Sequence, residues 1–193
     1  MCVGAASIVV MPTLPLIDQT LAAYRVFSPA LASGRLKVLV VGSDCADTSV
    51  TFTCNAESIA DFLAQHRDEP VLVLSTYDSL PDLAEGASAA ATPLELCVFD
   101  EAHYMAGRGR KYSFGLQPAN LPVRRRLFLT GTPRVFVDRG ADEGRDIRRD
   151  ESRDDGSAAM AARSMDDEKL FGPTVYRMAF RQGETNGIDP RGG

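Results

Sequence analysis

A lysine-containing phosphate loop is missing from this 193-residue chain, which has only three lysines. Lys37, Lys111 and Lys169 are followed by valine, tyrosine and leucine, and none of them is preceded by glycine. The glycine-rich loop that cradles nucleotide phosphates needs the run G-K-[ST], because its backbone N–H groups and its lysine hold the phosphate oxygens. The sequence therefore excludes such a loop anywhere between residues 1 and 193.

Cysteine and histidine spacings typical of zinc sites are also absent. The four cysteines form no C-x-x-C pair, and the two histidines lie far apart in the sequence. These residues are Cys2, Cys45, Cys54, Cys97, His66 and His103. We therefore expect no zinc site, and cysteines without disulfide-type spacing are typical of a reducing compartment.

Long hydrophobic runs are missing as well. No stretch of about 18 uninterrupted apolar residues occurs, which excludes a membrane-spanning helix. Residues 1–17 are apolar, but they lack a basic start and are interrupted by Pro12 and Pro15, which disfavours a secretory signal. We expect a cytoplasmic or nuclear protein with no membrane partner.

Charge of neither sign is in large excess, since 21 basic and 26 acidic residues give a net charge of −5. This balance excludes a highly basic protein that coats nucleic acid and an acidic disordered chain. With 45% hydrophobic residues, the chain is long enough to bury the core of one domain.

Short apolar runs alternate with helical or loop-like segments along the chain. Strands are predicted at residues 7–11, 35–41, 71–74, 94–99 and 126–129, with a further candidate at 174–180. Helices are predicted at 16–24 and 57–67, the second capped by Asn55, whereas 85–92 is expected to be a loop or a loose helix. Nearly continuous Val/Leu/Ile strands separated by helices predict an α/β domain with a parallel sheet covered on both faces.

Residues 138–155 differ from their surroundings, because 13 of these 18 residues are charged. Such a segment cannot bury enough apolar surface to offset its ordering entropy, so we expect a disordered insertion at 138–163. A phosphate-binding arginine cluster is the alternative interpretation. The expected organisation is a main domain at 1–137, this insertion, an exit segment at 164–181 and a disordered tail at 182–193.

Two adjacent carboxylates follow the predicted strand at 94–99, in the run Asp100-Glu101-Ala102-His103. Ligands of open α/β sheets collect at the carboxyl ends of the strands. In a nucleotide site, the first carboxylate holds the Mg²⁺ shell that bridges the phosphates, and the second orients or deprotonates the attacking water. The structural alternative is a polar strand exit with a helix-capping aspartate.

A second polar strand exit follows about thirty residues later, as Thr130-Gly131-Thr132-Pro133-Arg134. Alone, this run is equally typical of an ordinary turn. The basic cluster at 124–126 precedes it, and a solvated strand start explains at least two of those three arginines.

The order of these motifs resembles the first RecA-like lobe of superfamily-two helicases and translocases, in particular the branch that shares its motor with type III restriction Res subunits. In that comparison residues 9–20 are similar to motif Ia, 74–80 to motif Ib, 100–107 to motif II and 130–134 to motif III. Residues 164–173 are similar to the segment that leads out of the lobe. The resemblance covers roughly residues 7–180.

The resemblance implies a role for each residue at a motif position. The implied residues are Glu101, His103, Thr130 and Thr132 for catalysis, Asp100 and Glu101 for the cofactor, Asp100 for the metal, and Pro12, Gln19, Ser43, Ser75, Thr76 and Tyr77 for nucleic acid. The cofactors would be ATP and Mg²⁺, and the partners would be nucleic acid, DNA rather than RNA, and a second RecA-like lobe.

The chain departs from this pattern because it lacks the phosphate loop with its strand, and the second lobe that supplies arginine fingers. The expected fold is therefore a RecA-like parallel sheet without the strand that lies beside the motif III strand. We expect a nucleic-acid-dependent ATPase lobe that is inactive alone. The alternatives are a non-catalytic remnant that binds nucleic acid or a partner, and a chain truncated at both ends.

Overall fold

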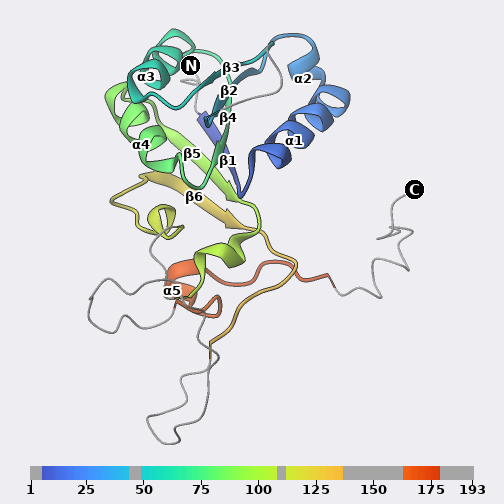
Figure 1. Ribbon diagram of the computed structural model, residues 1–193, viewed down its shortest axis with the longest axis vertical. Coiled ribbons are helices and arrows are strands. Elements are labelled where there is room, and N and C mark those ends of the chain that lie inside the picture. Colours follow the sequence, from blue (N-terminus) through green and yellow to red (C-terminus); the bar gives the residue numbers. More distant parts are fainter. Residues whose placement is uncertain (1–5, 44–48, 108–111, 137–162, 179–193) are drawn as a thin grey trace, which may run out of the picture.

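The computed structural model describes residues 6–43, 49–107, 112–136 and 163–178, which build one parallel six-stranded sheet (Figure 1). The strand order is β3-β2-β4-β1-β5-β6, and every neighbouring pair is parallel. The strands are β1 (Ala6–Met11), β2 (Lys37–Val41), β3 (Thr51–Thr53), β4 (Val71–Thr76), β5 (Leu94–Phe99) and β6 (Val123–Phe128). The α/β class predicted from the alternating apolar runs is confirmed.

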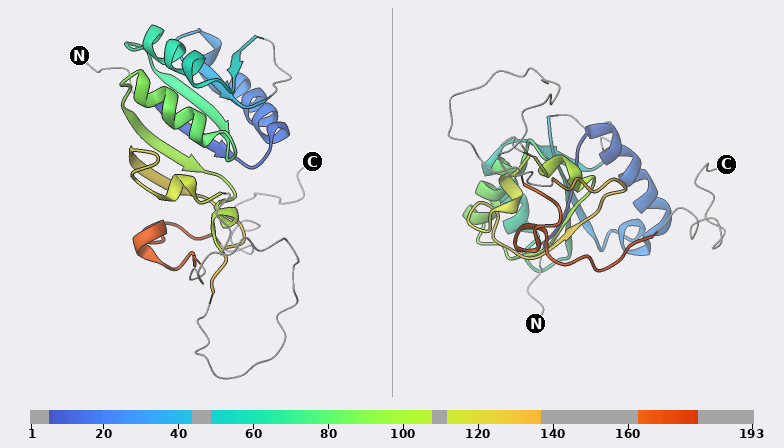
Figure 2. Two further views of the ribbon diagram at one scale, coloured as in Figure 1. Left: turned by 60° about the vertical axis from the view of Figure 1, so that its left-hand side comes forward. Right: turned by 90° about the horizontal axis from the view of Figure 1, so that it is seen from below.

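Helices lie on both faces of the sheet, with α1 on one side and α3 and α4 on the other (Figure 2). The helices are α1 (Leu14–Phe27), α2 (Pro29–Ala32), α3 (Ala56–Gln65), α4 (Leu80–Ala89) and α5 (Glu168–Phe171), with 3-10 turns η1 (Ala102–Met105) and η2 (Phe114–Leu116). Among the described residues, no helix combines the length and the apolar character needed to cross a bilayer.

Alternating strand residues form two separate cores because successive side chains of a strand point to opposite faces. On β4, Val71 and Val73 pack with α3 and α4, whereas Leu72 and Leu74 pack with α1. The first core also receives Phe171 from α5. Strands β2 and β4 are buried on both faces, which explains why their sequences read as continuous apolar runs.

The helices follow from their buried spacing and their caps. In α1, Ile17 and Leu21 lie one turn apart and are both buried. In α3 the side chain of Asn55 accepts a hydrogen bond of 2.9 Å from the backbone N–H of Ser58. The predicted cap of this helix is therefore confirmed, and it satisfies a donor that the first helical turn cannot pair internally.

The expectation of a loop or loose helix at 85–92 is wrong in part, because α4 runs from Leu80 to Ala89. Its buried positions include Leu83, Ala84 and Ala87, which have the spacing of a helix face. The sequence pattern of this face is weak because its small residues contribute little hydrophobicity. At Gly86 an added Cβ would lie 2.7 Å from the backbone carbonyl oxygen of Ala56 and 2.7 Å from the Ile59 side chain, so the backbone of α4 lies directly against α3 at this position.

The strands at the edges of the sheet differ most from expectation. The short strand β3 is not predicted, and β6 begins at Val123 rather than at residue 126. The candidate strand at 174–180 is wrong for its described part, because residues 173–178 have no regular structure. The apolar side chains of Val175, Tyr176 and Met178 are exposed, and these residues pair with no strand of the described sheet.

β6 is an edge of the sheet, since β5 is its only strand neighbour in the described part of the chain. The resemblance to helicase lobes predicts a further strand beside β6, and this stays a prediction. The segment 163–171 returns to the same end of the domain, where Gly107 and Arg163 form an antiparallel bridge and Phe171 contacts Phe128 with ring centroids 5.2 Å apart. The predicted insertion at 138–163 falls outside the described residues except for Arg163, and the tail at 182–193 lies wholly outside them.

Candidate functional site

The two carboxylates predicted as cofactor and metal ligands lie at the carboxyl end of β5, in the interior of the sheet between β1 and β6. The backbone N–H of Asp100 donates to the carbonyl oxygen of Val10 at 2.9 Å, which ties this strand end to β1. The Asp100 carboxylate accepts a hydrogen bond of 3.0 Å from the N–H of Glu101. Asp100 is half-buried, and backbone groups bind both its N–H and its carboxylate.

Glu101 has a left-handed backbone conformation, with φ +50° and ψ +43°. Residues other than glycine rarely adopt this conformation, and such outliers cluster at functional sites. Two hydrogen bonds hold its flanks. The Tyr77 hydroxyl donates to the Asp100 carbonyl oxygen at 2.7 Å, and the N–H of Ala102 donates to the Leu129 carbonyl oxygen at 2.8 Å.

The predicted catalytic residues lie together. Nδ1 of His103 is 3.0 Å from a carboxylate oxygen of Glu101 and 3.1 Å from the hydroxyl oxygen of Thr130. The same hydroxyl oxygen accepts a hydrogen bond from the N–H of Thr132 at 3.1 Å. A single ring nitrogen therefore joins the end of β5 to the end of β6.

The histidine side chain is less exposed than that of the glutamate, at 13% against 43%. The His103 ring also stacks on Tyr104 with centroids 4.5 Å apart. From Tyr104 the edge-to-face contacts continue to Tyr112 at 6.0 Å and from Tyr112 to Tyr77 at 5.5 Å. An aromatic chain thus connects the site with the end of β4.

Three of the residues predicted to contact nucleic acid follow or end neighbouring strands. Pro12 follows β1, Ser43 lies just beyond β2, and Thr76 is the last residue of β4. Met11 is the register partner of Thr76, so these strand ends are level. Because the carboxyl ends of parallel strands meet at one rim, this row lies at the same edge of the sheet as Asp100. Gln19 is exposed on α1 nearby in the sequence.

Two other predicted nucleic-acid residues do not lie at the surface. Ser75 is fully buried and donates to the carbonyl oxygen of Thr76, and Tyr77 is 1% exposed. Burial also raises the pKa of the Tyr77 phenol, and the nearby charge of Asp100 adds to this effect. The side chains of these two residues are therefore not exposed for contact with a ligand. Sequence reasoning missed the hydrogen bond that the Tyr77 hydroxyl donates to the backbone carbonyl oxygen of Asp100.

The donor set at the site fits Mg²⁺ better than zinc. In the described ranges no group of three or more His, Cys, Asp and Glu side chains could hold a metal ion. Magnesium needs no such cage, because it is usually bound by one or two carboxylates, by water and by substrate phosphates. Asp100 offers a carboxylate of this kind.

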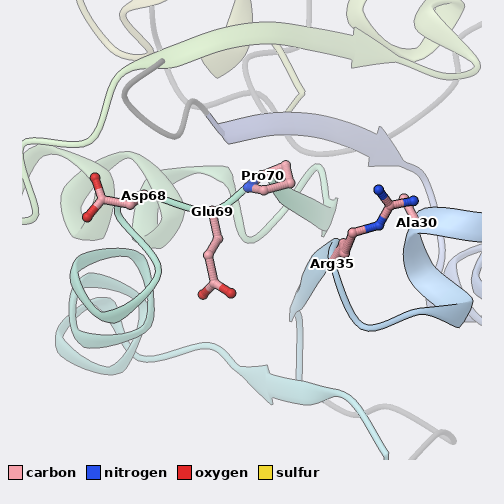
Figure 3. Close-up of a pocket in the computed structure, with 5 residues that line it drawn as sticks. All are labelled: Ala30, Arg35, Asp68, Glu69 and Pro70. Carbon is pink, nitrogen blue, oxygen red and sulfur yellow. The ribbon is translucent and has the colours of Figure 1, made fainter. Parts of the chain in front are cut away.

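Two hollows lie away from this site. One of about 440 Å³ is lined by Arg35, Asp68, Glu69 and two further residues, at the amino ends of β2 and β4 (Figure 3). It is at the opposite rim of the sheet from Asp100, and the side chains of Arg35 and Asp68 point away from each other. The other, of about 480 Å³, lies along α1 and includes Gln19 and Phe27.

Comparison with known proteins finds a shared fold. No family model matches the sequence, and no curated protein matches it either. The chain is similar to the structure of a nuclease-deletion mutant of the Type ISP restriction-modification enzyme LlaGI in complex with a DNA substrate mimic. The TM-score is 0.69 at 19% sequence identity, over 96% of this chain and 16% of that one. The likeness shows the fold, and this chain spans about a sixth of that structure's length.

Proposed function

We propose that this chain is the nucleotide-binding lobe of a helicase-like, DNA-dependent ATPase, in which Asp100 holds Mg²⁺ and Glu101 activates water. The observation that carries the proposal is the joint position of both carboxylates, His103 and Thr130 at the carboxyl rim of a parallel sheet. That rim is where nucleotides bind in open α/β folds. When bound, Mg²⁺ would neutralise the charge that develops on the transferred phosphoryl group.

The two carboxylates suit different roles because their surroundings differ. Asp100 is half-buried and its carboxylate accepts a backbone hydrogen bond, so it is fixed as a ligand should be. Glu101 is more exposed and contacts the His103 ring, so it can reach a water molecule while the ring orients it. The contact between His103 and Thr130 then connects the reacting end of β5 to β6.

This sequence contains no G-K-[ST] run, so the proposal requires that another segment supplies the phosphate-binding loop. The open edge of β6 is where the resemblance places the strand that leads into such a loop. Arginine fingers would come from a second lobe, and their loss alone removes a factor of about 10³–10⁵ in rate. We therefore expect weak nucleotide binding and no measurable turnover from the isolated chain.

DNA binding is the second part of the proposal. Pro12, Ser43 and Thr76 form a row of small or polar groups beside the carboxylates, and such groups contact phosphates without reading bases. The LlaGI structure that shares this fold holds a DNA substrate mimic, which favours DNA over RNA. The net charge of −5 predicts weak binding that is strongly sensitive to salt.

Calorimetric titration of the full chain with ATP, with and without Mg²⁺, tests the nucleotide site. We expect weak binding that requires Mg²⁺ and is lost in Asp100→Asn. Asp61→Asn is the matched control, because Asp61 is an exposed aspartate on α3. Binding that is unchanged in Asp100→Asn, or equally strong without Mg²⁺, would contradict the assignment. Phosphate release with DNA present should stay at background for both the unsubstituted chain and Glu101→Gln, because the isolated chain is not expected to turn over ATP.

A non-catalytic DNA-binding remnant is the second candidate, and the same row of strand ends supports it. Fluorescence anisotropy with labelled single- and double-stranded DNA at low salt separates the two candidates. The remnant predicts DNA binding with no Mg²⁺-dependent ATP binding. In both cases Thr76→Ala should weaken DNA binding by about two- to tenfold, as expected for one lost phosphate contact.

A further inference from the structure

We propose that Tyr77 is the positioning residue of the carboxylate pair: its buried hydroxyl holds the Asp100–Glu101 peptide in the orientation that places Glu101 against His103. The structural part stands on the geometry alone, whereas the consequence for cation binding rests on the proposed function. Neither the sequence pattern nor the resemblance assigns this role to Tyr77, which they place among the residues that contact nucleic acid.

The peptide between Asp100 and Glu101 is held at both of its polar atoms. Its carbonyl oxygen accepts from the Tyr77 hydroxyl at 2.7 Å, and its N–H donates to the Asp100 carboxylate at 3.0 Å. The peptide orientation sets the backbone angles of Glu101, whose φ of +50° is one that side chains other than glycine seldom adopt. Such a conformation persists only where surrounding contacts over-determine it.

The Tyr77 side chain is itself fixed. It is 1% exposed, and its ring lies between Phe99 and Tyr112, with centroid separations of 6.3 and 5.5 Å. The turn around it is closed by a hydrogen bond of 2.9 Å between the hydroxyl groups of Thr76 and Ser79. With the ring packed and the turn closed, the hydroxyl has a defined direction and cannot leave the Asp100 carbonyl without repacking.

The position of Glu101 depends on this peptide. In the left-handed conformation its carboxylate reaches to 3.0 Å from Nδ1 of His103. Reorientation of the peptide would move that carboxylate and also release the N–H that the Asp100 carboxylate accepts. Tyr77 therefore acts on both carboxylates through one backbone group, and it does so without touching the ligand.

Tyr77→Phe is the direct test, because it keeps the ring and removes only the hydroxyl. In two-dimensional NMR spectra of the full ¹⁵N- and ¹³C-labelled chain, we expect changes at Glu101, Ala102 and His103, including the three-bond HN–Hα coupling of Glu101. Tyr24→Phe is the matched control, since it removes the same hydroxyl from α1. Changes confined to residues 76–78, with the Glu101 coupling unchanged, would overturn the proposal.

A measurement on the unsubstituted chain covers the case in which Tyr77→Phe does not fold. The hydroxyl proton of Tyr77 should exchange with solvent far more slowly than that of Tyr24, because it is buried and donates to a carbonyl. Equal exchange rates would contradict the hydrogen bond on which the proposal depends.

Titration with Mg²⁺ alone, followed at the Asp100 and Glu101 resonances, tests the functional consequence. We expect the dissociation constant to rise about three- to tenfold in Tyr77→Phe, as for one lost hydrogen bond, and to be unchanged in Tyr24→Phe. An equal constant in Tyr77→Phe would overturn the positioning role. If Mg²⁺ shifts neither resonance in the unsubstituted chain, the proposed cation site fails, and the Glu101 coupling alone decides the role of Tyr77.

Discussion

Residues at the two rims of the sheet form different carboxylate–histidine contacts. At the carboxyl rim, Glu101 and His103 belong to the candidate site. At the amino rim, the two carboxylate oxygens of Glu69 lie 3.2 Å from Nζ of Lys37 and 2.5 Å from Nδ1 of His66. The position of Asp100 and Glu101 directly after an apolar strand could be predicted from the sequence, and their role as site residues stays a prediction. The left-handed backbone of Glu101 could not be predicted, because it depends on Tyr77 and Leu129, which are distant in the sequence.

The amino-rim cluster predicts a pH dependence of stability. The hydrogen bond from His66, followed by that from Lys37, lowers the pKa of Glu69 from its ordinary value of 4.5. A lowered folded-state pKa gives stability that is present above 4.5 and is lost as the pH falls through the lowered value. In urea unfolding, Glu69→Gln should therefore be less stable than the unsubstituted chain at neutral pH.

The difference should disappear in acid, where Glu69 is protonated in both folded and unfolded chains. Glu85→Gln on the exposed face of α4 is the control, and it should show little difference at either pH. A Glu69→Gln deficit that stays the same at low pH would show that the effect is not electrostatic.

Cys97 should be chemically inert in the folded chain. It is fully buried in β5, and burial raises the pKa of its thiol to about 12, so the reactive thiolate is not populated near neutral pH. Cys54 is exposed and provides an internal comparison. Mass spectrometry after brief alkylation should find Cys54 modified and Cys97 modified only after unfolding. Equal labelling of both in the native chain would contradict the buried position of β5.

Secondary-structure elements could be predicted where hydrophobic contrast is strong. Strands β1, β2, β4 and β5 and helix α3 were located by apolar periodicity and, for α3, by its cap. Helix α4 was predicted only in part, as a loop or a loose helix at 85–92, because alanine, glycine and serine give little contrast between its faces. The strand was predicted from residue 126, whereas β6 begins at Val123, and the exposure of Arg124 and Arg125 agrees with the solvated strand start expected for this basic cluster.

The α3–α4 contact predicts a cost for any side chain at Gly86. Alanine would gain helix propensity of up to about 1 kcal/mol. Its Cβ would however lie 2.7 Å from the Ala56 carbonyl oxygen and from Ile59, and overpacking of this kind costs about 1–3 kcal/mol. We expect Gly86→Ala to lower the free energy of unfolding by about 1–2 kcal/mol, measured with urea. Ser88→Ala, on the exposed face of α4, should not destabilise, and a stable Gly86→Ala would mean that the helices lie further apart.

At the scale of the whole molecule, the parallel sheet brings residues that are distant in sequence to one rim. Asp100 and Thr130 follow the neighbouring strands β5 and β6, and Pro12, Ser43 and Thr76 end or follow β1, β2 and β4. The α/β class and this convergence could be predicted, because alternating strands and helices favour a parallel sheet. The strand order and the burial of Ser75 and Tyr77 could not, because they depend on how the strands pair and on packing across the sheet.

The position of a bound divalent cation tests the central claim most directly. Mn²⁺ is a paramagnetic substitute for Mg²⁺ and broadens the NMR resonances of nearby nuclei. Added to the full labelled chain, it should broaden the amides of Asp100, Glu101 and residues 130–132, and Asp100→Asn should abolish this effect while Asp61→Asn leaves it intact. Broadening centred instead on Asp68 and Glu69, or persisting at the β5 end in Asp100→Asn, would contradict the assignment of the carboxylate pair.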